Sequence, residues 1–98
     1  MYYLKLSGFI PESKQMEFEQ TYRLISRQIP KTCDGYTISK DALDEGVYYF
    51  VSYWSLQQQL QFFSHSTSFL MMMGAFKTLG ELRENVSGEM TQAKINLT

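Results

Sequence analysis

The chain has 98 residues, and its nine Lys and Arg against ten Asp and Glu leave a net charge of −1. A chain of this length can hold only one hydrophobic core, so we expect a single domain over residues 1–98, and because like charges form no block, we expect no binding to nucleic acid or to a membrane. The single cysteine, Cys33, excludes an internal disulfide, and the first residues lack the pattern of a secretory signal, so the expected compartment is the cytoplasm.

The first part of the chain predicts a strand, a helix and a short second strand. Residues 2–9 alternate in polarity with the two-residue period of a strand. Over residues 13–29, apolar side chains recur at the spacing of one helix face, and Ser13 is the expected N-cap. The residues of that face are Phe18, Tyr22, Ile25 and Ile29. A turn then leads to a short β-favouring piece, residues 36–39.

The strongest strand signal lies between Val47 and Trp54. Every residue there except Ser52 is β-branched or aromatic. One face of the strand would carry Tyr48, Phe50, Ser52 and Trp54, and the other Val47, Tyr49, Val51 and Tyr53. Since both faces are rich in apolar and aromatic side chains, this pattern predicts a strand buried on both sides.

The last third of the chain predicts a broken helix and a weak strand. Two runs at helical spacing flank a serine-rich interruption, so we expect a bend or break near Ser66. The apolar positions are Leu56, Leu60 and Phe63, then Phe69, Met72, Met73, Phe76 and Leu79. Gly80 is the expected C-terminal cap of the second run. Residues 86–97 are polar enough to predict an exposed edge strand.

The resulting order of elements, β-α-β-β-α-β, is that of an α+β ferredoxin-like fold. In this fold two helices cover one face of a four-stranded antiparallel sheet. The other face of the strand around Phe50 would then remain wet unless something covers it. A second copy of the chain is the simplest cover, since most soluble oligomers are two-fold homodimers. We therefore expect a homodimer formed through the sheet face.

Several of these segments resemble one known family. The strand "YYFVSYW", the helix entry "SLQQQLQFFSHSTSFL" and the tail "MMMGAFKTLG" are similar to those of the antibiotic biosynthesis monooxygenase family of dimeric α+β-barrel proteins. The most specific feature is an aromatic strand that ends on Trp and is followed by Leu, Ser and Phe at six, twelve and fifteen positions. Here these residues are Trp54, Leu60, Ser66 and Phe69. The likeness covers nearly the whole chain.

The resemblance implies a dimeric barrel with a small apolar cavity between sheet and helices in each subunit. It also implies oxidation of a small aromatic or quinol-like molecule by molecular oxygen, with no cofactor. An electron-rich phenolate can itself reduce oxygen, so such a protein needs only to position the substrate, exclude water and help to remove a proton. The expected partners are thus a second copy of the chain and a small hydrophobic or aromatic molecule.

The sequence departs from the family at two positions. Many members have a histidine nine residues after the aromatic end of the strand, where this chain has Phe63, and its only histidine, His65, lies two residues further. Two residues correspond to about 200° of helix rotation, so His65 does not align with that position. Haem-degrading relatives rely on an Asn in the first strand, which "YYLKLSGF" lacks, and haem cleavage is therefore disfavoured.

The candidate site follows from the resemblance and from the aromatic residues. His65 is either a solvated or capping residue or the proton acceptor, and Trp54 is either a core residue or part of the catalytic pocket. The expected ligand-binding residues are Tyr48, Phe50, Phe63, Phe69 and Met73. No His, Cys and carboxylate cluster has the spacing of a metal site, so we expect no metal.

Two functions remain open from the sequence. The first is a cofactor-independent monooxygenase acting on a small aromatic or quinol-like substrate. The second is a non-catalytic dimer that binds a small hydrophobic metabolite. Phe63 in place of histidine favours the second function, whereas the nearly complete family pattern favours the first.

Overall fold

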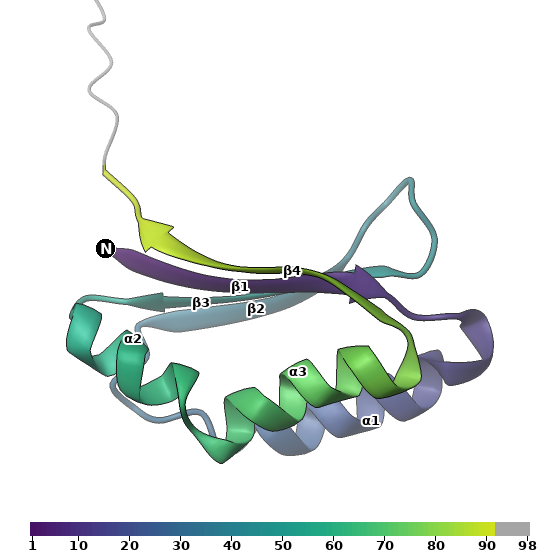
Figure 1. The fold of residues 1–98 in the computed structure, drawn as a ribbon, viewed down its shortest axis with the longest axis horizontal. Coiled ribbons are helices and arrows are strands. Elements are labelled where there is room, and N and C mark those ends of the chain that lie inside the picture. Colours follow the sequence, from purple (N-terminus) through teal and green to yellow (C-terminus); the bar gives the residue numbers. More distant parts are fainter. Residues whose placement is uncertain (92–98) are drawn as a thin grey trace, which may run out of the picture.

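The structure has two layers, a sheet and a set of helices (Figure 1). A computed structural model describes residues 1–91. Its elements are β1 (Tyr2–Phe9), α1 (Glu12–Ser26), β2 (Gly35–Lys40), β3 (Val47–Trp54), α2 (Gln57–Ser64), α3 (Thr67–Leu79) and β4 (Glu81–Glu89). The strands pair antiparallel in the order β2-β3-β1-β4, and the helices all cover the same face of the sheet. The expected ferredoxin-like α+β fold is confirmed.

The strand β3 organises the core, and its bounds are those expected from the sequence. Its inward-facing residues are buried under the helices, and they are Tyr48, Phe50, Ser52 and Trp54. The rings of Phe50 and Trp54 lie 6.5 and 5.0 Å from the ring of Phe63 on α2. The two-residue period of the strand thus places half of its aromatic side chains in the core and the other half on the opposite face.

The helix α1 packs on the sheet through the face that its periodicity predicts, with Phe18 and Ile25 buried. Its start differs from the prediction. The N-cap position is Pro11, with φ −61° and no side-chain cap, so the assignment of Ser13 as N-cap is wrong. Proline fixes φ at a value suited to a helix entry, and the Pro11 carbonyl accepts a 2.8 Å hydrogen bond from the N–H of Lys14. The first turn therefore forms without a capping side chain.

The end of α1 also lies earlier than predicted. The helix ends at Ser26, whose hydroxyl donates a 2.9 Å hydrogen bond to the carbonyl of Arg23. Such local bonds compete with the helical ladder. Residues 27–29 continue as a turn, in which Ile29 still packs against the core. The predicted apolar face is therefore correct although the boundary is not.

The predicted break near Ser66 is confirmed and separates α2 from α3. The Ser66 hydroxyl accepts a 3.2 Å hydrogen bond from the N–H of Phe69 and donates a 2.6 Å hydrogen bond to the carbonyl of Phe63. One side chain thus caps the start of α3 and satisfies a carbonyl at the end of α2. None of the described helices is long and apolar enough to cross a membrane.

The strand β4 starts five residues before the predicted edge strand, so the predicted start at residue 86 is wrong. It begins directly after α3 because Gly80 allows the chain to pass close to β1. A Cβ at Gly80 would overlap the carbonyl oxygen of Phe9. The part of the predicted strand over residues 92–97 lies outside the described residues. With its neighbour β1 on one side only, β4 is an edge strand, as expected.

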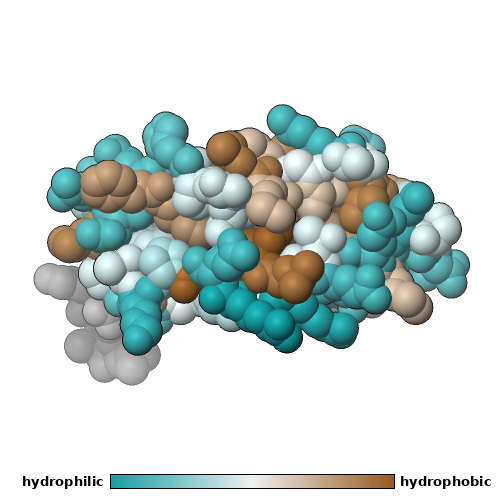
Figure 2. All heavy atoms as spheres, turned by 90° about the horizontal axis from the view of Figure 1, so that it is seen from below, coloured by the Kyte–Doolittle hydropathy of each residue, from teal (hydrophilic) through white to brown (hydrophobic). Residues whose placement is uncertain are grey.

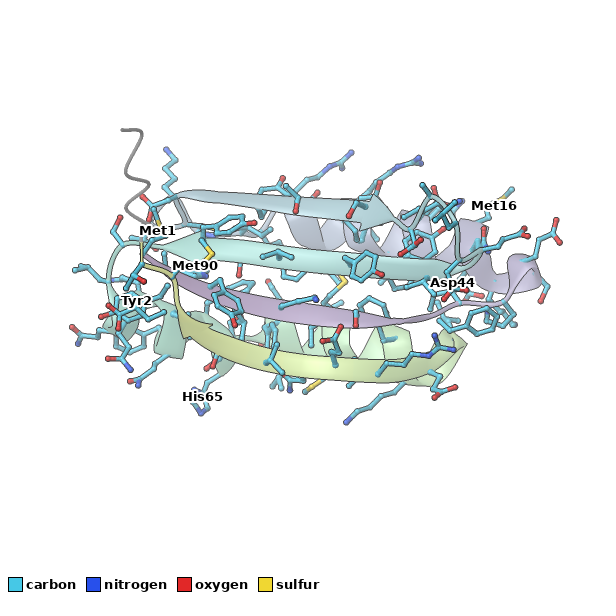
Figure 3. All side chains as sticks on the ribbon, turned by 90° about the horizontal axis from the view of Figure 1, so that it is seen from above. Met1, Tyr2, Met16, Asp44, His65 and Met90 are labelled. Carbon is cyan, nitrogen blue, oxygen red and sulfur yellow. The ribbon has the colours of Figure 1, made fainter. Side chains whose placement is uncertain are left out.

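The face of the sheet opposite the helices, here called the uncovered face, is seen in Figure 3. The strand register places alternate residues on it. They include Tyr3, Lys5, Ser7 and Phe9 of β1, Val47, Tyr49, Val51 and Tyr53 of β3, and Glu84 and Val86 of β4. At one end the loop between β2 and β3 rises above this face (Figure 1). The outer surface of the helix layer, by contrast, carries both polar and apolar residues (Figure 2).

Candidate functional site

A cavity of about 490 Å³ lies on the helix side of the sheet, between β1 and β4 above and α2 and α3 below. Its apolar lining comes from Leu4 of β1, Leu60 of α2, and Phe69 and Met73 of α3. Three of them, Leu4, Leu60 and Phe69, are buried core residues. The four residues therefore form a small apolar floor at the edge of the hydrophobic core, and most of the remaining lining is polar.

Two rows of polar side chains flank this floor. One row, Gln57, Gln61 and Ser64, lies on α2, and the other, Asn85, Ser87 and Glu89, lies on β4. Positions i, i+4 and i+7 share one face of a helix, and positions i, i+2 and i+4 share one face of a strand. The periodicity of the helix and of the strand thus places the three side chains of each row on the same side of their element. We call the space between them the amide cavity, after Gln57, Gln61 and Asn85.

The side chains of the amide cavity make few hydrogen bonds to other described residues, and the Ser64 hydroxyl donates a 2.7 Å bond to the Gln61 carbonyl. The Asn85 amide donates a 3.4 Å bond to the sulfur of Met73, which is a weak acceptor. Tyr2 lies in the same lining and pairs across the strands with Glu89. Donors and acceptors therefore face the cavity from two sides. A ligand with an apolar ring body and hydroxyl or carbonyl groups at its edges matches this distribution.

Of the residues expected to bind a ligand, Phe69 and Met73 line the amide cavity, and the other three lie elsewhere. Phe50 and Phe63 are buried in the core. Tyr48 lies beside α1, where its hydroxyl donates a 2.9 Å hydrogen bond to Glu19. Burial raises the pKa of the Tyr48 phenol. The ring of Phe63 still packs 5.7 Å from the ring of Phe69, so two of the five residues line the cavity and two more lie in the adjoining core.

Trp54 lies in the core beside the amide cavity and is not part of its lining. The side chain is fully buried, and its indole N–H donates a 2.9 Å hydrogen bond to the Ser52 hydroxyl. That hydroxyl lies 3.4 Å from the carbonyl oxygen of Leu4. The polar atom of Trp54 thus has a partner inside the protein and faces no open space.

His65 is an exposed residue at the C-terminal end of α2. Its Nδ1 lies 2.8 Å from the carbonyl oxygen of Gln61 and 3.2 Å from the Ser64 hydroxyl. Figure 3 shows the ring projecting beyond the β4 edge of the sheet, and it borders a separate shallow hollow with Phe62. The structure therefore places His65 at a helix end, outside the amide cavity.

The described residues contain no group of three His, Cys, Asp or Glu side chains arranged to hold a metal ion. Cys33 is half-buried, and its thiol donates a 3.1 Å hydrogen bond to the carbonyl of Gly35. A thiol held in this way has no neighbouring base in hydrogen-bond contact, so it lacks the arrangement that activates a nucleophilic cysteine.

Sequence reasoning missed most of the polar lining of the amide cavity. Asn85, Ser87 and Glu89 belong to a segment that reads as a polar edge strand, and Gln57 and Gln61 read as the solvated side of a helix. The available signal was spacing: polar residues repeat with the strand period on β4 and with the helix period on α2. Only the tertiary fold shows that both rows face the same space.

Comparison with solved structures identifies the architecture. A protein from Deinococcus radiodurans described as a "putative antibiotic biosynthesis monooxygenase" superposes with a TM-score of 0.79 and 17% identity, covering 100% of this chain and 99% of its own. The chain shares the fold of that structure. A second structure, described as an antibiotic biosynthesis monooxygenase, gives a TM-score of 0.75 and 16% identity, covering 96% and 100%.

The same fold also occurs in a structure described only as a conserved protein from Methanosarcina mazei Go1. It superposes with a TM-score of 0.74 and 11% identity, covering 89% of this chain and 87% of its own. No protein-family model and no curated protein matches the sequence. The comparisons thus show the fold, and they confirm the resemblance seen in the sequence at that level.

Within this fold, the spacing of Trp54, Leu60, Ser66 and Phe69 has a structural explanation. Trp54, Leu60 and Phe69 are buried together in the core, and Ser66 caps α3. The spacing therefore describes how β3, α2 and α3 are joined. It identifies the fold well because it specifies a joint between three elements.

Proposed function

We propose that the chain is a cofactor-independent monooxygenase that oxidises a small aromatic or quinol-like molecule bound in the amide cavity. The supporting observation is a cavity of about 490 Å³ with an apolar floor and two polar rows, in a fold shared with structures described as antibiotic biosynthesis monooxygenases. We further propose that residues 1–98 act as one domain and that two copies form a homodimer.

The reaction needs only the substrate and molecular oxygen. A naphthalene-1,4-diol and O₂ give 2-hydroxy-1,4-naphthoquinone and water. One oxygen atom forms a C–O bond at the ring carbon that loses its hydrogen, and the other leaves as water. The substrate supplies all the electrons that reduce oxygen, so the protein contributes position, desolvation and a path for protons.

The residues of the amide cavity have distinct tasks in this proposal. The side chains of Phe69 and Met73 contact the ring of the substrate and exclude water from it. The amides of Gln57 and Asn85 bind the ring hydroxyls from opposite sides. A substrate held at both edges keeps the ring carbon fixed while oxygen reacts, which lowers the entropic part of the barrier.

The uncovered face supports the proposed homodimer because the charged side chains of its central strands are paired within one chain. Glu84 accepts a 2.6 Å hydrogen bond from Ser7 and lies 3.3 Å from the ammonium of Lys5. Tyr49 donates a 2.7 Å hydrogen bond to Asp41. A second copy can therefore cover the aromatic residues beside Lys5 and Glu84 without leaving either of these charges unpaired, and an unpaired buried charge is the costly part of covering a polar surface.

One observation favours the second candidate, a non-catalytic dimer that binds a small hydrophobic metabolite. His65, the single histidine, lies outside the amide cavity. A binding protein needs the apolar floor and the amides and has no need of a proton acceptor. In that case the same ligands bind and oxygen is not consumed.

Oxygen uptake with naphthalene-1,4-diol and hydroxylated polycyclic aromatics tests the proposal. The matched variants are Gln57→Ala, which removes an amide from the cavity, and Gln58→Ala, which removes a neighbouring amide of α2 outside its lining. We expect Gln57→Ala to lower kcat/KM about tenfold. A tenfold decrease corresponds to a loss of about 1.4 kcal/mol of transition-state stabilisation, which is the size expected for one lost hydrogen bond. Gln58→Ala and His65→Ala should keep the natural rate.

The outcomes separate the candidates. Enzyme-dependent uptake that Gln57→Ala slows and Gln58→Ala leaves unchanged supports the monooxygenase. Ligand binding without uptake for any substrate supports the binding protein. If His65→Ala abolishes uptake while Gln57→Ala has no effect, the chemistry lies outside the amide cavity and the proposal fails.

A further inference from the structure

The charged groups of the amide cavity are few and of one sign. Among the described residues that line it, Glu89 is the only carboxylic acid, and none is Lys, Arg or His. The remaining polar groups are amides, hydroxyls and the phenol of Tyr2. The basic residues of the neighbouring strands lie on the other face of the sheet, where Lys5 pairs with Glu84 and Arg83 lies over the ring of Phe9. Among the described lining residues, no Lys, Arg or His side chain therefore offsets Glu89.

The position of Glu89 is fixed by the strand register. Tyr2 pairs with Trp54 on one side and with Glu89 on the other, so the three residues form one row across β3, β1 and β4. Residues paired in this way share a face of the sheet. The row runs from the core, where Trp54 is buried, to the exposed carboxylate of Glu89. Glu89 thus stands at the outer end of the cavity.

We propose that the amide cavity selects neutral aromatic ligands over anionic ones and that Glu89 sets this preference. This inference rests on the proposed function, because it concerns the ligand of the same cavity. A carboxylate or sulfonate on the ligand would leave water for a space without a cation and would lie near a like charge, and both effects oppose binding. A phenol, quinone or carboxamide keeps its hydrogen bonds to the amide rows at no such cost.

The proposal is tested with two ligands of the same shape. Naphthalene-2-carboxamide is neutral, and naphthalene-2-carboxylate carries one negative charge at pH 7. Their dissociation constants are measured by calorimetry on the natural chain, Glu89→Gln and Glu81→Gln. The Trp54 indole N–H provides a second readout by NMR, since it is the only tryptophan signal and lies one strand from Tyr2.

Glu81→Gln is the matched control because it removes the same charge from the same strand. Eight residues of strand separate Glu81 from Glu89, which is about 27 Å, and Glu81 is not part of the cavity lining. We expect the natural chain and Glu81→Gln to bind the carboxamide at least about tenfold more tightly than the carboxylate. In Glu89→Gln this preference should shrink by about fivefold, which corresponds to one solvent-screened charge pair at close range.

Each result has a definite meaning. If the carboxylate binds the natural chain as tightly as the carboxamide, the selectivity is refuted while the cavity remains a binding site. An equal loss of preference in Glu81→Gln would show that overall charge, and not Glu89, is responsible. If neither ligand binds and the Trp54 signal does not move, the cavity is no aromatic binding site, and the proposed function fails together with this inference.

Discussion

A hydrogen bond between the side chains of Trp54 and Ser52 lies inside the core. Both side chains are fully buried, and the indole N–H has the Ser52 hydroxyl at 2.9 Å as its partner. Ser52→Ala leaves this N–H unsatisfied, so we expect it to lower the free energy of unfolding by about 1–3 kcal/mol. Urea denaturation followed by the fluorescence of Trp54 measures the change.

Ser55→Ala is the control for that measurement. It removes a hydroxyl of similar geometry, which donates a 2.7 Å hydrogen bond to Asp34 at an exposed site. Surface contacts of this kind usually contribute within about 0.5 kcal/mol. A Ser52→Ala variant as stable as Ser55→Ala would show that the buried bond does not stabilise the core.

Asp41 accepts a hydrogen bond from Tyr49, a residue of the uncovered face. Hydrogen bonds from the Tyr49 hydroxyl and from the backbone N–H groups of Leu43 and Asp44 hold the pKa of its carboxyl below the usual value. The same contact raises the pKa of Tyr49. A lowered carboxyl pKa adds stability above the unfolded-state value of about 3.9, and this stability is lost as the pH falls through the folded-state pKa.

Asp41→Asn should therefore lose this acid-dependent part of the stability. The difference in unfolding free energy between the natural chain and Asp41→Asn should be largest above about pH 4 and should shrink at lower pH. Denaturation between pH 2 and pH 6 measures it, with Asp44→Asn in the same loop as the control. A difference that stays constant over this range would show that the Asp41 carboxylate is not preferentially ionised in the fold.

At the scale of elements, the junction between α3 and β4 depends on Gly80. A Cβ there would overlap the carbonyl oxygen of Phe9, whereas Gly74 in the middle of α3 has no atom within 4 Å of the added position. We expect Gly80→Ala to cost about 2 kcal/mol or more, because backbone has to move. Gly74→Ala should stabilise the chain by about 0.5–1 kcal/mol, the difference in helix propensity.

Thermal unfolding of both glycine variants measures these changes in stability. Both substitutions add the same methyl group, so opposite changes in the free energy of unfolding would come from the different surroundings of the two glycines. If Gly80→Ala is as stable as the natural chain, the close approach between α3 and β1 does not control where β4 begins. The Gly74→Ala variant also shows whether α3 tolerates a side chain beside the cavity residue Met73.

The elements differ in how far the sequence predicts them. The bounds of β1 follow from its alternating polarity and those of β3 from its β-branched and aromatic residues, because both strands are central in the sheet and one face of each is buried in the core. The start of β4 could not be predicted in the same way. Its inward-facing residues Asn85 and Ser87 line a cavity, so the alternation of apolar and polar residues that marks a strand is absent.

The candidate site was harder to predict than the fold for a related reason. Helical geometry places His65 about 200° away from Phe63, and the structure agrees, with Phe63 buried and His65 exposed. The amide cavity itself joins Tyr2 near one end of the chain to Asn85 near the other. Such proximity is set by the pairing of β1 with β4, which no local pattern contains.

For the whole molecule, the main question is what covers the uncovered face. Its central residue Val51 is half-buried and pairs with Lys5 of β1 and Thr37 of β2. We expect the natural chain to sediment with twice the mass of one chain at micromolar concentration. Val51→Arg should give single chains with an unchanged circular dichroism spectrum, because a charge at this position is solvated in one chain and is buried between two.

Leu24→Arg provides the comparison. Leu24 is 59% exposed on α1, in the helix layer that the proposed dimer leaves open to solvent. Its replacement adds the same charge and should leave the dimer intact. Dissociation by Leu24→Arg and not by Val51→Arg would place the contact on the helix layer, and a natural chain that sediments as single chains would exclude the dimer. Because the amide cavity lies on the other side of the sheet, Val51→Arg should still bind naphthalene-2-carboxamide, which separates assembly from ligand binding.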